Sequence, residues 1–121
     1  MNLPTTADAS GLHDYLKVAK VDDLPAGSMM TVAGLDLVDV LVINFGGNYY
    51  AISGVCTHKG APLRQGSVDG KYIVCPWHKA NFRLADGQHY WPADRPIRSF
   101  SVKIEDGYIY VQKRKQQQFV T

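Results

Sequence analysis

The segment VDVLVINFGGNYYAI, residues 38–52, places two apolar, β-branched runs on either side of a Gly-Gly-Asn turn. Glycine and asparagine tolerate the positive φ angles that tight hairpins require, so this segment predicts two antiparallel strands, over residues 38–45 and 49–52. Asp-Gly pairs at 69–70, 86–87 and 106–107 carry the same turn chemistry. The chain is therefore expected to contain four hairpins.

The remainder of the chain also favours strands over helices. Short apolar runs alternate with Gly, Asn and Asp, and no segment of a dozen residues has apolar positions at helical spacing. We expect an all-β fold with strands over residues 15–20, 29–32, 38–45, 49–52, 71–74, 81–84, 99–104 and 108–112. Apolar and polar residues alternate in 99–104, which predicts that this strand is half buried.

Size and composition bound the remaining possibilities. A chain of 121 residues and 13.4 kDa predicts one domain over residues 1–121, with frayed ends at about 1–12 and 113–121 that lack periodicity. The longest apolar runs have four residues, whereas a membrane span needs about 20. Residues 1–6 lack the basic and apolar regions of a secretory signal, so a cytoplasmic location is expected.

The charge is distributed unevenly along the chain. A net charge of +2 is too small for a typical nucleic-acid-binding domain. Residues 54–85 nevertheless hold five basic side chains against one acidic side chain, while residues 1–53 hold two lysines against six aspartates. The basic segment fits a surface that meets an acidic protein partner.

Two irregular segments, 54–67 and 75–79, contain the only two cysteines and two of the four histidines, in CTH at 56–58 and CPWH at 75–78. A disulfide would leave the histidines unexplained, and a reducing cytoplasm opposes it. Two cysteines and two histidines could also bind structural zinc, although zinc fingers usually place both cysteines on one arm. One cysteine and one histidine on each arm suit a binuclear cluster, with the cysteines on one iron and the histidines on the other.

This pattern resembles that of the Rieske [2Fe–2S] proteins, C-x-H followed by fifteen to seventeen residues and C-x-x-H. The resemblance covers about residues 15–112 and includes CTHKGAPL at 56–63 and the prolines around 91–97. It implies a Rieske-like antiparallel β-sandwich or barrel with a small cluster-binding subdomain of two loops, within about 54–85. It also implies that the [2Fe–2S] cluster is bound by Cys56 and Cys75 on the inner iron and by His58 and His78 on the outer iron.

The chain departs from the high-potential members of this family. Those members resemble C-T-H-L-G-C and C-P-C-H-G-S-x-Y, whereas the matching positions here are Ala61, Trp77, Ala80 and Phe82. The extra disulfide and the hydroxyl donors to sulfur are therefore missing. We expect a reduction potential below about 0 mV, in the lower part of the range of about −150 to +300 mV for such clusters.

Two further departures concern the shape of the site. Lys79 follows the second ligand motif, and Trp91 precedes the loop proline, at positions where family members often have glycine. We therefore expect a differently shaped second loop, and we expect Trp77 and Trp91 to shield the cluster.

The resemblance implies a soluble one-electron carrier that passes electrons from a reductase to a terminal acceptor such as an oxygenase. It implies redox proteins as partners, no nucleic-acid or membrane partner, and a monomer in isolation. No catalytic residues are expected, because the chain lacks room for the mononuclear iron domain of the family's oxygenases. Two alternatives stay open: a small fixed subunit of a larger oxidoreductase, of the nitrite reductase small subunit type, and a structural zinc module.

Overall fold

The computed structural model describes residues 12, 14–57, 60–77 and 79–113. The expected frayed ends fall almost entirely outside these residues, as do His58 and His78 of the expected ligand set. Fraying of the ends and the histidine assignments therefore stay predictions.

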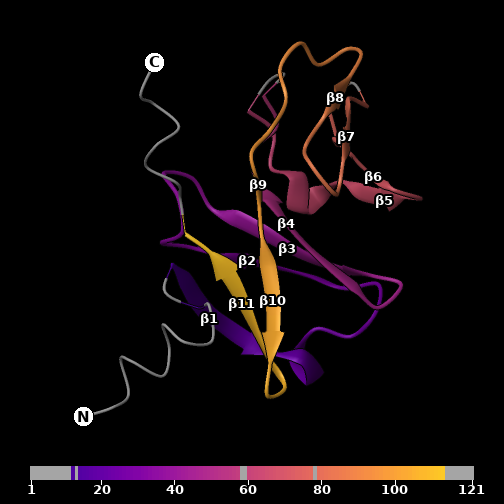
Figure 1. The fold of residues 1–121 in the computed structure, drawn as a ribbon. Coiled ribbons are helices and arrows are strands. Elements are labelled where there is room, and N and C mark those ends of the chain that lie inside the picture. Colours follow the sequence, from indigo (N-terminus) through magenta and orange to yellow (C-terminus); the bar gives the residue numbers. More distant parts are fainter. Residues whose placement is uncertain (1–11, 13, 58–59, 78, 114–121) are drawn as a thin grey trace.

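The described chain forms three antiparallel sheets (Figure 1). The first sheet has the strand order β1 (Tyr15–Lys20), β11 (Tyr108–Gln112) and β10 (Val102–Glu105). The second has the order β2 (Met29–Val32), β3 (Val40–Phe45), β4 (Asn48–Ser53) and β9 (Ser99–Phe100). The third has the order β5 (Ser67–Asp69), β6 (Tyr72–Val74), β7 (Asn81–Arg83) and β8 (His89–Tyr90). The all-β fold class is confirmed.

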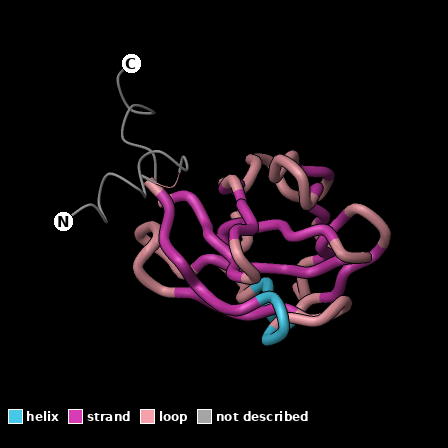
Figure 2. Tube along the Cα trace, turned by 60° about the horizontal axis from the view of Figure 1, so that its bottom comes forward, coloured by secondary structure: helices cyan, strands magenta, loops and turns pink. Residues whose placement is uncertain are grey.

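Helix is limited to two short 3-10 turns in the described residues, η1 (Val21–Asp23) and η2 (Leu63–Gln65). Figure 2 shows the same arrangement from another side, with loops joining the strands almost throughout. Within the described ranges, no helix has the length and apolar character needed to cross a bilayer.

The second sheet is buried on both of its faces. Along β3, Val40 and Val42 belong to the apolar core shared with the first sheet, while Leu41 and Ile43 belong to the core shared with the third sheet. A strand covered on both sides needs no polar face, which explains its unbroken apolar run. Each fully buried aliphatic side chain of this kind contributes about 1.5–3 kcal/mol.

All four predicted hairpins are present. Register pairs close them at Phe45↔Asn48, Asp69↔Tyr72, Phe82↔His89 and Glu105↔Tyr108. In the β3–β4 turn Gly46 and Gly47 have φ angles of 63° and 88°, so both turn residues use the positive φ region that glycine tolerates.

The strand predictions differ from the structure mainly in three places, apart from one-residue differences at the ends of predicted strands 49–52, 71–74 and 81–84. Strands β5 and β8 were not predicted, because runs of three and two residues are too short to show alternation. The predicted strand 38–45 begins at residue 40. The predicted strand 99–104 is two strands, β9 and β10, because the chain leaves the second sheet for the first at Ser101, whose carbonyl accepts the Gln112 N–H at 2.9 Å.

Candidate metal centre

The two cysteines approach each other from two loops at the third sheet. Cys56 lies three residues after the end of β4, and Cys75 lies directly after the end of β6. Each is only 1% exposed, and both belong to the apolar core between the second and third sheets. The two side chains are close enough for Cys56 to raise the pKa of the Cys75 thiol. The fold therefore brings together two sulfurs that are 19 positions apart in the sequence.

Backbone hydrogen bonds close each loop at its base. The Cys56 N–H donates to the Ala61 carbonyl at 2.9 Å, and the Cys75 N–H donates to the Ala80 carbonyl at 2.7 Å. We call the enclosed residues 57–60 the first arm and 76–79 the second arm. The two histidines of the expected ligand set fall within these arms by sequence but lie outside the described residues.

Each arm turns through a left-handed residue just before it closes. Gly60 has a φ of 74° in the first arm, and Lys79 has a φ of 57° in the second. Lysine at such a φ costs about 1–2 kcal/mol, a cost that glycine avoids. We expected a differently shaped second arm, but at position 79 the backbone keeps a conformation that glycine adopts freely.

The electrostatics of the cysteine pair oppose a thiolate that has no cation beside it. Burial, together with the neighbouring Cys56, raises the pKa of the Cys75 thiol to about 11. The Trp77 N–H, which donates to Cys75 Sγ at 3.4 Å, acts in the opposite direction. A thiolate at this position near neutral pH therefore needs a positive charge beside it, and a metal ion supplies one.

The donor set fits a thiolate-bound metal. No disulfide joins Cys56 to Cys75, so the disulfide alternative is wrong for this structure. In the part of the chain that the structure describes, no group of three or more Cys, His, Asp or Glu side chains could hold a metal ion. Of the four expected ligands, the structure therefore describes only the two cysteines, and the roles of His58 and His78 stay predictions.

A third segment, residues 91–98 between β8 and β9, also reaches the first arm. The Thr57 hydroxyl donates to the Arg95 carbonyl at 2.7 Å, and Arg95 Nη2 donates to the Thr57 carbonyl at 3.2 Å. The sequence resemblance included the prolines of this segment but indicated no contact between it and the first arm. The Thr57–Arg95 pairing was missed, because no local pattern signals a contact between residues 38 positions apart.

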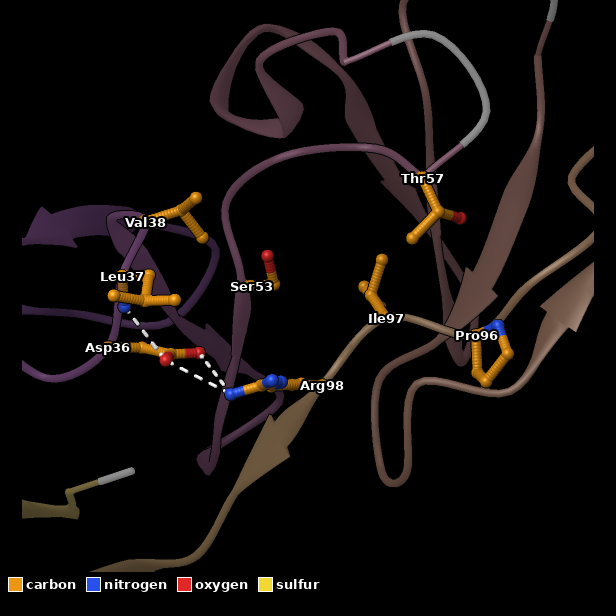
Figure 3. Close-up of a pocket in the computed structure, with 8 residues that line it drawn as sticks. All are labelled: Asp36, Leu37, Val38, Ser53, Thr57, Pro96, Ile97 and Arg98. Atoms are coloured by element: carbon orange, nitrogen blue, oxygen red, sulfur yellow. Dashed lines mark hydrogen bonds and ion pairs between the residues drawn. The ribbon is translucent and has the colours of Figure 1, made fainter. Parts of the chain in front are cut away.

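A cleft of about 260 Å³ lies beside this contact. It is lined by residues 36–38, Ser53, Thr57 and residues 96–98 (Figure 3). On one side Arg98 Nη1 binds both carboxylate oxygens of Asp36, at 3.1 and 3.2 Å. The Asp36 side chain is only 4% exposed, so this ion pair is largely shielded from solvent on its acidic side. It fastens the end of segment 91–98 to the loop before β3.

The tryptophans do not both shield the site. Trp91 is 86% exposed, so its predicted role as a shielding residue is wrong, and Trp77 is 47% exposed. The exposure of Trp91 is explained by the turn after β8, in which the Ala93 N–H donates to the Tyr90 carbonyl at 3.0 Å. This turn buries Ala93 and leaves Trp91 in solvent.

Ala80 and Phe82 are both fully buried, in the same apolar core as the two cysteines. This location agrees with the expectation that they border the metal site. Neither side chain carries a hydroxyl that could donate to sulfur.

The family model of the Rieske [2Fe-2S] domain matches residues 14–101. The chain belongs to the Rieske [2Fe–2S] domain family. A similar protein is ferredoxin CarAc of Metapseudomonas resinovorans, which is 31% identical and aligns over 84% of this chain and 95% of its own. Human apoptosis-inducing factor 3 is 36% identical over 82% of this chain, which spans only 16% of that protein.

Solved structures agree with the family assignment. A chain in the complex of reduced oxygenase and oxidized ferredoxin in carbazole 1,9a-dioxygenase is 30% identical to this Rieske protein, with a TM-score of 0.77. The alignment covers 85% of this chain and 98% of that one. The Rieske fold predicted from the two ligand motifs is therefore confirmed.

Proposed function

We propose that this Rieske protein is a ferredoxin, an electron carrier that takes one electron from a reductase and delivers it to a terminal oxygenase. The observation that carries the proposal is the buried Cys56–Cys75 pair, held by two closed arms in a chain that matches a ferredoxin over nearly its whole length. Electron transfer is the general activity of such a site.

The proposed ligands are the thiolates of Cys56 and Cys75 and the imidazoles of His58 and His78. A [2Fe–2S] cluster bound in this way takes up and releases one electron. The chain itself excludes water from both sulfurs, since each cysteine is 1% exposed. The Trp77 N–H points at Cys75 Sγ and stabilises negative charge there.

The proposed activity is electron transfer without substrate chemistry, so no residue is assigned a catalytic role. A cytoplasmic location, a monomeric state and the absence of nucleic-acid or membrane partners belong to the same proposal.

The proposed partners are redox proteins that dock beside the two arms. The exposed side chains there include Trp77 and Lys79 on the second arm and Trp91 just after β8. Tryptophan is enriched among the residues that contribute most to protein–protein binding. The alternative of a fixed subunit in a larger oxidoreductase has no specific observation in its favour.

The first test is a reductive titration of protein purified without oxygen. We expect two irons and two sulfides per chain, uptake of one electron, and an electron paramagnetic resonance signal whose average g lies below that of an all-cysteine cluster. Stoichiometric zinc without iron would overturn the proposal and establish the zinc module instead.

A second test addresses electron delivery. The reduced protein is mixed in a stopped-flow instrument with the oxidised terminal oxygenase of carbazole 1,9a-dioxygenase, and its reoxidation is followed by visible absorption. We expect reoxidation that depends on the oxygenase concentration.

Size-exclusion chromatography of native lysate separates the free carrier from the fixed-subunit alternative, since a carrier elutes near 13.4 kDa and a fixed subunit elutes with its complex.

A further inference from the structure

Segment 91–98 connects the two arms of the candidate site. The segment begins directly after β8, in which Tyr90 pairs with Asn81. Because the second arm ends at residue 79, shortly before Asn81, residue 91 lies beside the end of that arm. Its middle reaches the first arm through Arg95 and Thr57. One segment therefore borders both of the loops that carry the expected ligands.

The contact with the first arm is reciprocal. The Thr57 hydroxyl donates to the Arg95 carbonyl, and the Arg95 guanidinium donates to the Thr57 carbonyl, at 2.7 and 3.2 Å. Thr57 is the single residue between Cys56 and His58 in the sequence. Both its side chain and its backbone carbonyl are thus held from outside the arm, which restricts the path of the chain between the two expected ligands.

The far end of segment 91–98 is firmly anchored, so it can hold the first arm in place. The Ser53 N–H donates to the Arg98 carbonyl at 2.9 Å, and Arg98 also binds Asp36 (Figure 3). The Ile97 N–H donates to the Gly87 carbonyl at 3.1 Å. A Cβ added at Gly87 would lie only 2.1 Å from the Ile97 carbonyl oxygen, so the two backbones are in close contact.

We propose that Thr57 and Arg95 are positioning residues of the electron-transfer site, whose reciprocal hydrogen bonds hold the first arm against the anchored segment 91–98. The inference rests on the proposed function and adds residues outside the ligand set. Arg95 has a second effect, because its guanidinium donates to the carbonyl that precedes residue 58. It places a positive charge there that favours the reduced site, partly balanced by Asp94, 3.7 Å from Arg95 Nε.

The test compares Thr57→Val, which removes the hydroxyl at nearly constant volume, with Thr57→Ser, which keeps it. Two quantities are measured on the iron-loaded proteins: the rate of iron loss to a chelator and the midpoint potential. We expect Thr57→Val to lose iron several-fold faster than wild type and to show a shifted midpoint. Thr57→Ser should retain the wild-type values of both.

A matched control removes a similar exposed hydroxyl contact away from the site. Tyr15 Oη donates to Ser101 Oγ at 2.8 Å, between the first sheet and the β9–β10 junction. Ser101→Ala should leave the rate of iron loss and the midpoint unchanged. Equal changes in Ser101→Ala and Thr57→Val would overturn the proposal, because they would indicate a general loss of stability.

Arg95→Ala provides an independent variant, since the Arg95 side chain is 71% exposed and its removal leaves the core intact. We expect a lower midpoint, with a shift that shrinks as the salt concentration rises. If Thr57→Val cannot be purified as a folded protein, the rate of iron loss and the midpoint potential of Arg95→Ala test the proposal instead. Wild-type rates and midpoints in these variants would overturn the positioning role, whereas failure of the wild type to bind a [2Fe–2S] cluster would overturn the proposed function.

Discussion

The first two sheets and the third sheet are stabilised in different ways. The first two sheets, which we call the scaffold, contain strands of up to six residues and share a core rich in Val, Leu and Ile. The strands of the third sheet have only two or three residues, and the core beneath them includes both cysteines and three alanines. Both cores bury large aliphatic side chains, but only the core beneath the third sheet contains the two sulfurs, so we expect the third sheet to depend in addition on what the cysteines bind.

Glycines are required for two different reasons in this fold. In the scaffold turns, a Cβ at Gly46 or Gly107 would meet nothing within 4 Å, so glycine is needed there only for its positive φ. Around the third sheet, a Cβ at Gly66 would lie 2.0 Å from the Val74 carbonyl oxygen. At Gly66 the backbones themselves approach closely, and space rather than φ requires glycine, whereas Gly70 in the β5–β6 turn has open space and a φ of 62°, as in the scaffold turns.

The largest effect is expected from Cys56→Ser or Cys75→Ser. Each variant should lose the iron, and because the free energy of metal binding is also folding free energy, the third sheet should lose stability with it. Iron and sulfide analysis measures the first effect. Hydrogen exchange measures the second, with increased exchange in β5–β8 and little change in β1, β10 and β11. Equal loss of protection in both regions would show that the contrast is wrong.

Gly66→Ala should destabilise the protein by about 3 kcal/mol or more, because a backbone carbonyl must move to admit the methyl group. The comparison is Gly46→Ala, which has open space but a φ of 63° and should cost about 1–2 kcal/mol. Urea unfolding of the two variants measures the difference. A larger loss for Gly46→Ala would contradict the assignment of close packing to the third sheet.

The sequence predicted most of the scaffold strands but only part of the site. Strands 15–20, 29–32 and 108–112 were predicted with their observed bounds, because long alternating or apolar runs flanked by turn residues are strong signals. The cysteines were placed in the correct loops by motif spacing. The Thr57–Arg95 and Asp36–Arg98 contacts could not be predicted, since each depends on how distant segments pack.

Restoring hydroxyl donors near the cysteines should raise the reduction potential. Ala80→Ser combined with Phe82→Tyr adds two O–H groups in the core that holds Cys56 and Cys75. One hydrogen bond to a charged sulfur contributes about 1.5–3 kcal/mol, equivalent to about 65–130 mV for one electron. A potentiometric titration measures the midpoint. An unchanged midpoint with the cluster intact would mean that these positions do not face the sulfurs.

Position 79 should show a smaller effect that depends on the backbone. Lys79→Gly is expected to be more stable than Lys79→Ala by about 1 kcal/mol, because only glycine adopts a φ of 57° without strain. Both variants remove the same charge, so their difference isolates the conformational cost. Thermal unfolding of the iron-loaded proteins measures it. Equal stability would mean that the second arm relaxes to a negative φ at this residue.

The smallest effect is expected in the β7–β8 turn, from Asp86→Asn. The Arg83 guanidinium, which binds Asp86 at 2.6 Å, lowers the pKa of that carboxyl from 3.8 to about 2. A lowered carboxyl pKa stabilises the folded protein above pH 3.8, and this contribution disappears as the pH falls toward 2. Wild type should therefore be slightly more stable than Asp86→Asn near neutrality, and the difference should narrow below about pH 4.

Tryptophan fluorescence during urea unfolding, recorded at several pH values, measures this difference. Asparagine keeps a side-chain oxygen that can accept the Gln88 N–H, as Asp86 Oδ1 does at 3.1 Å. The substitution therefore keeps this turn contact and removes the charge, together with one of the two hydrogen bonds that Asp86 accepts from Arg83. High salt should also reduce the difference, because both side chains are partly exposed, at 38% and 51%. A difference that persists unchanged at pH 3 and in high salt would assign the effect to the shape of the turn instead of the ion pair.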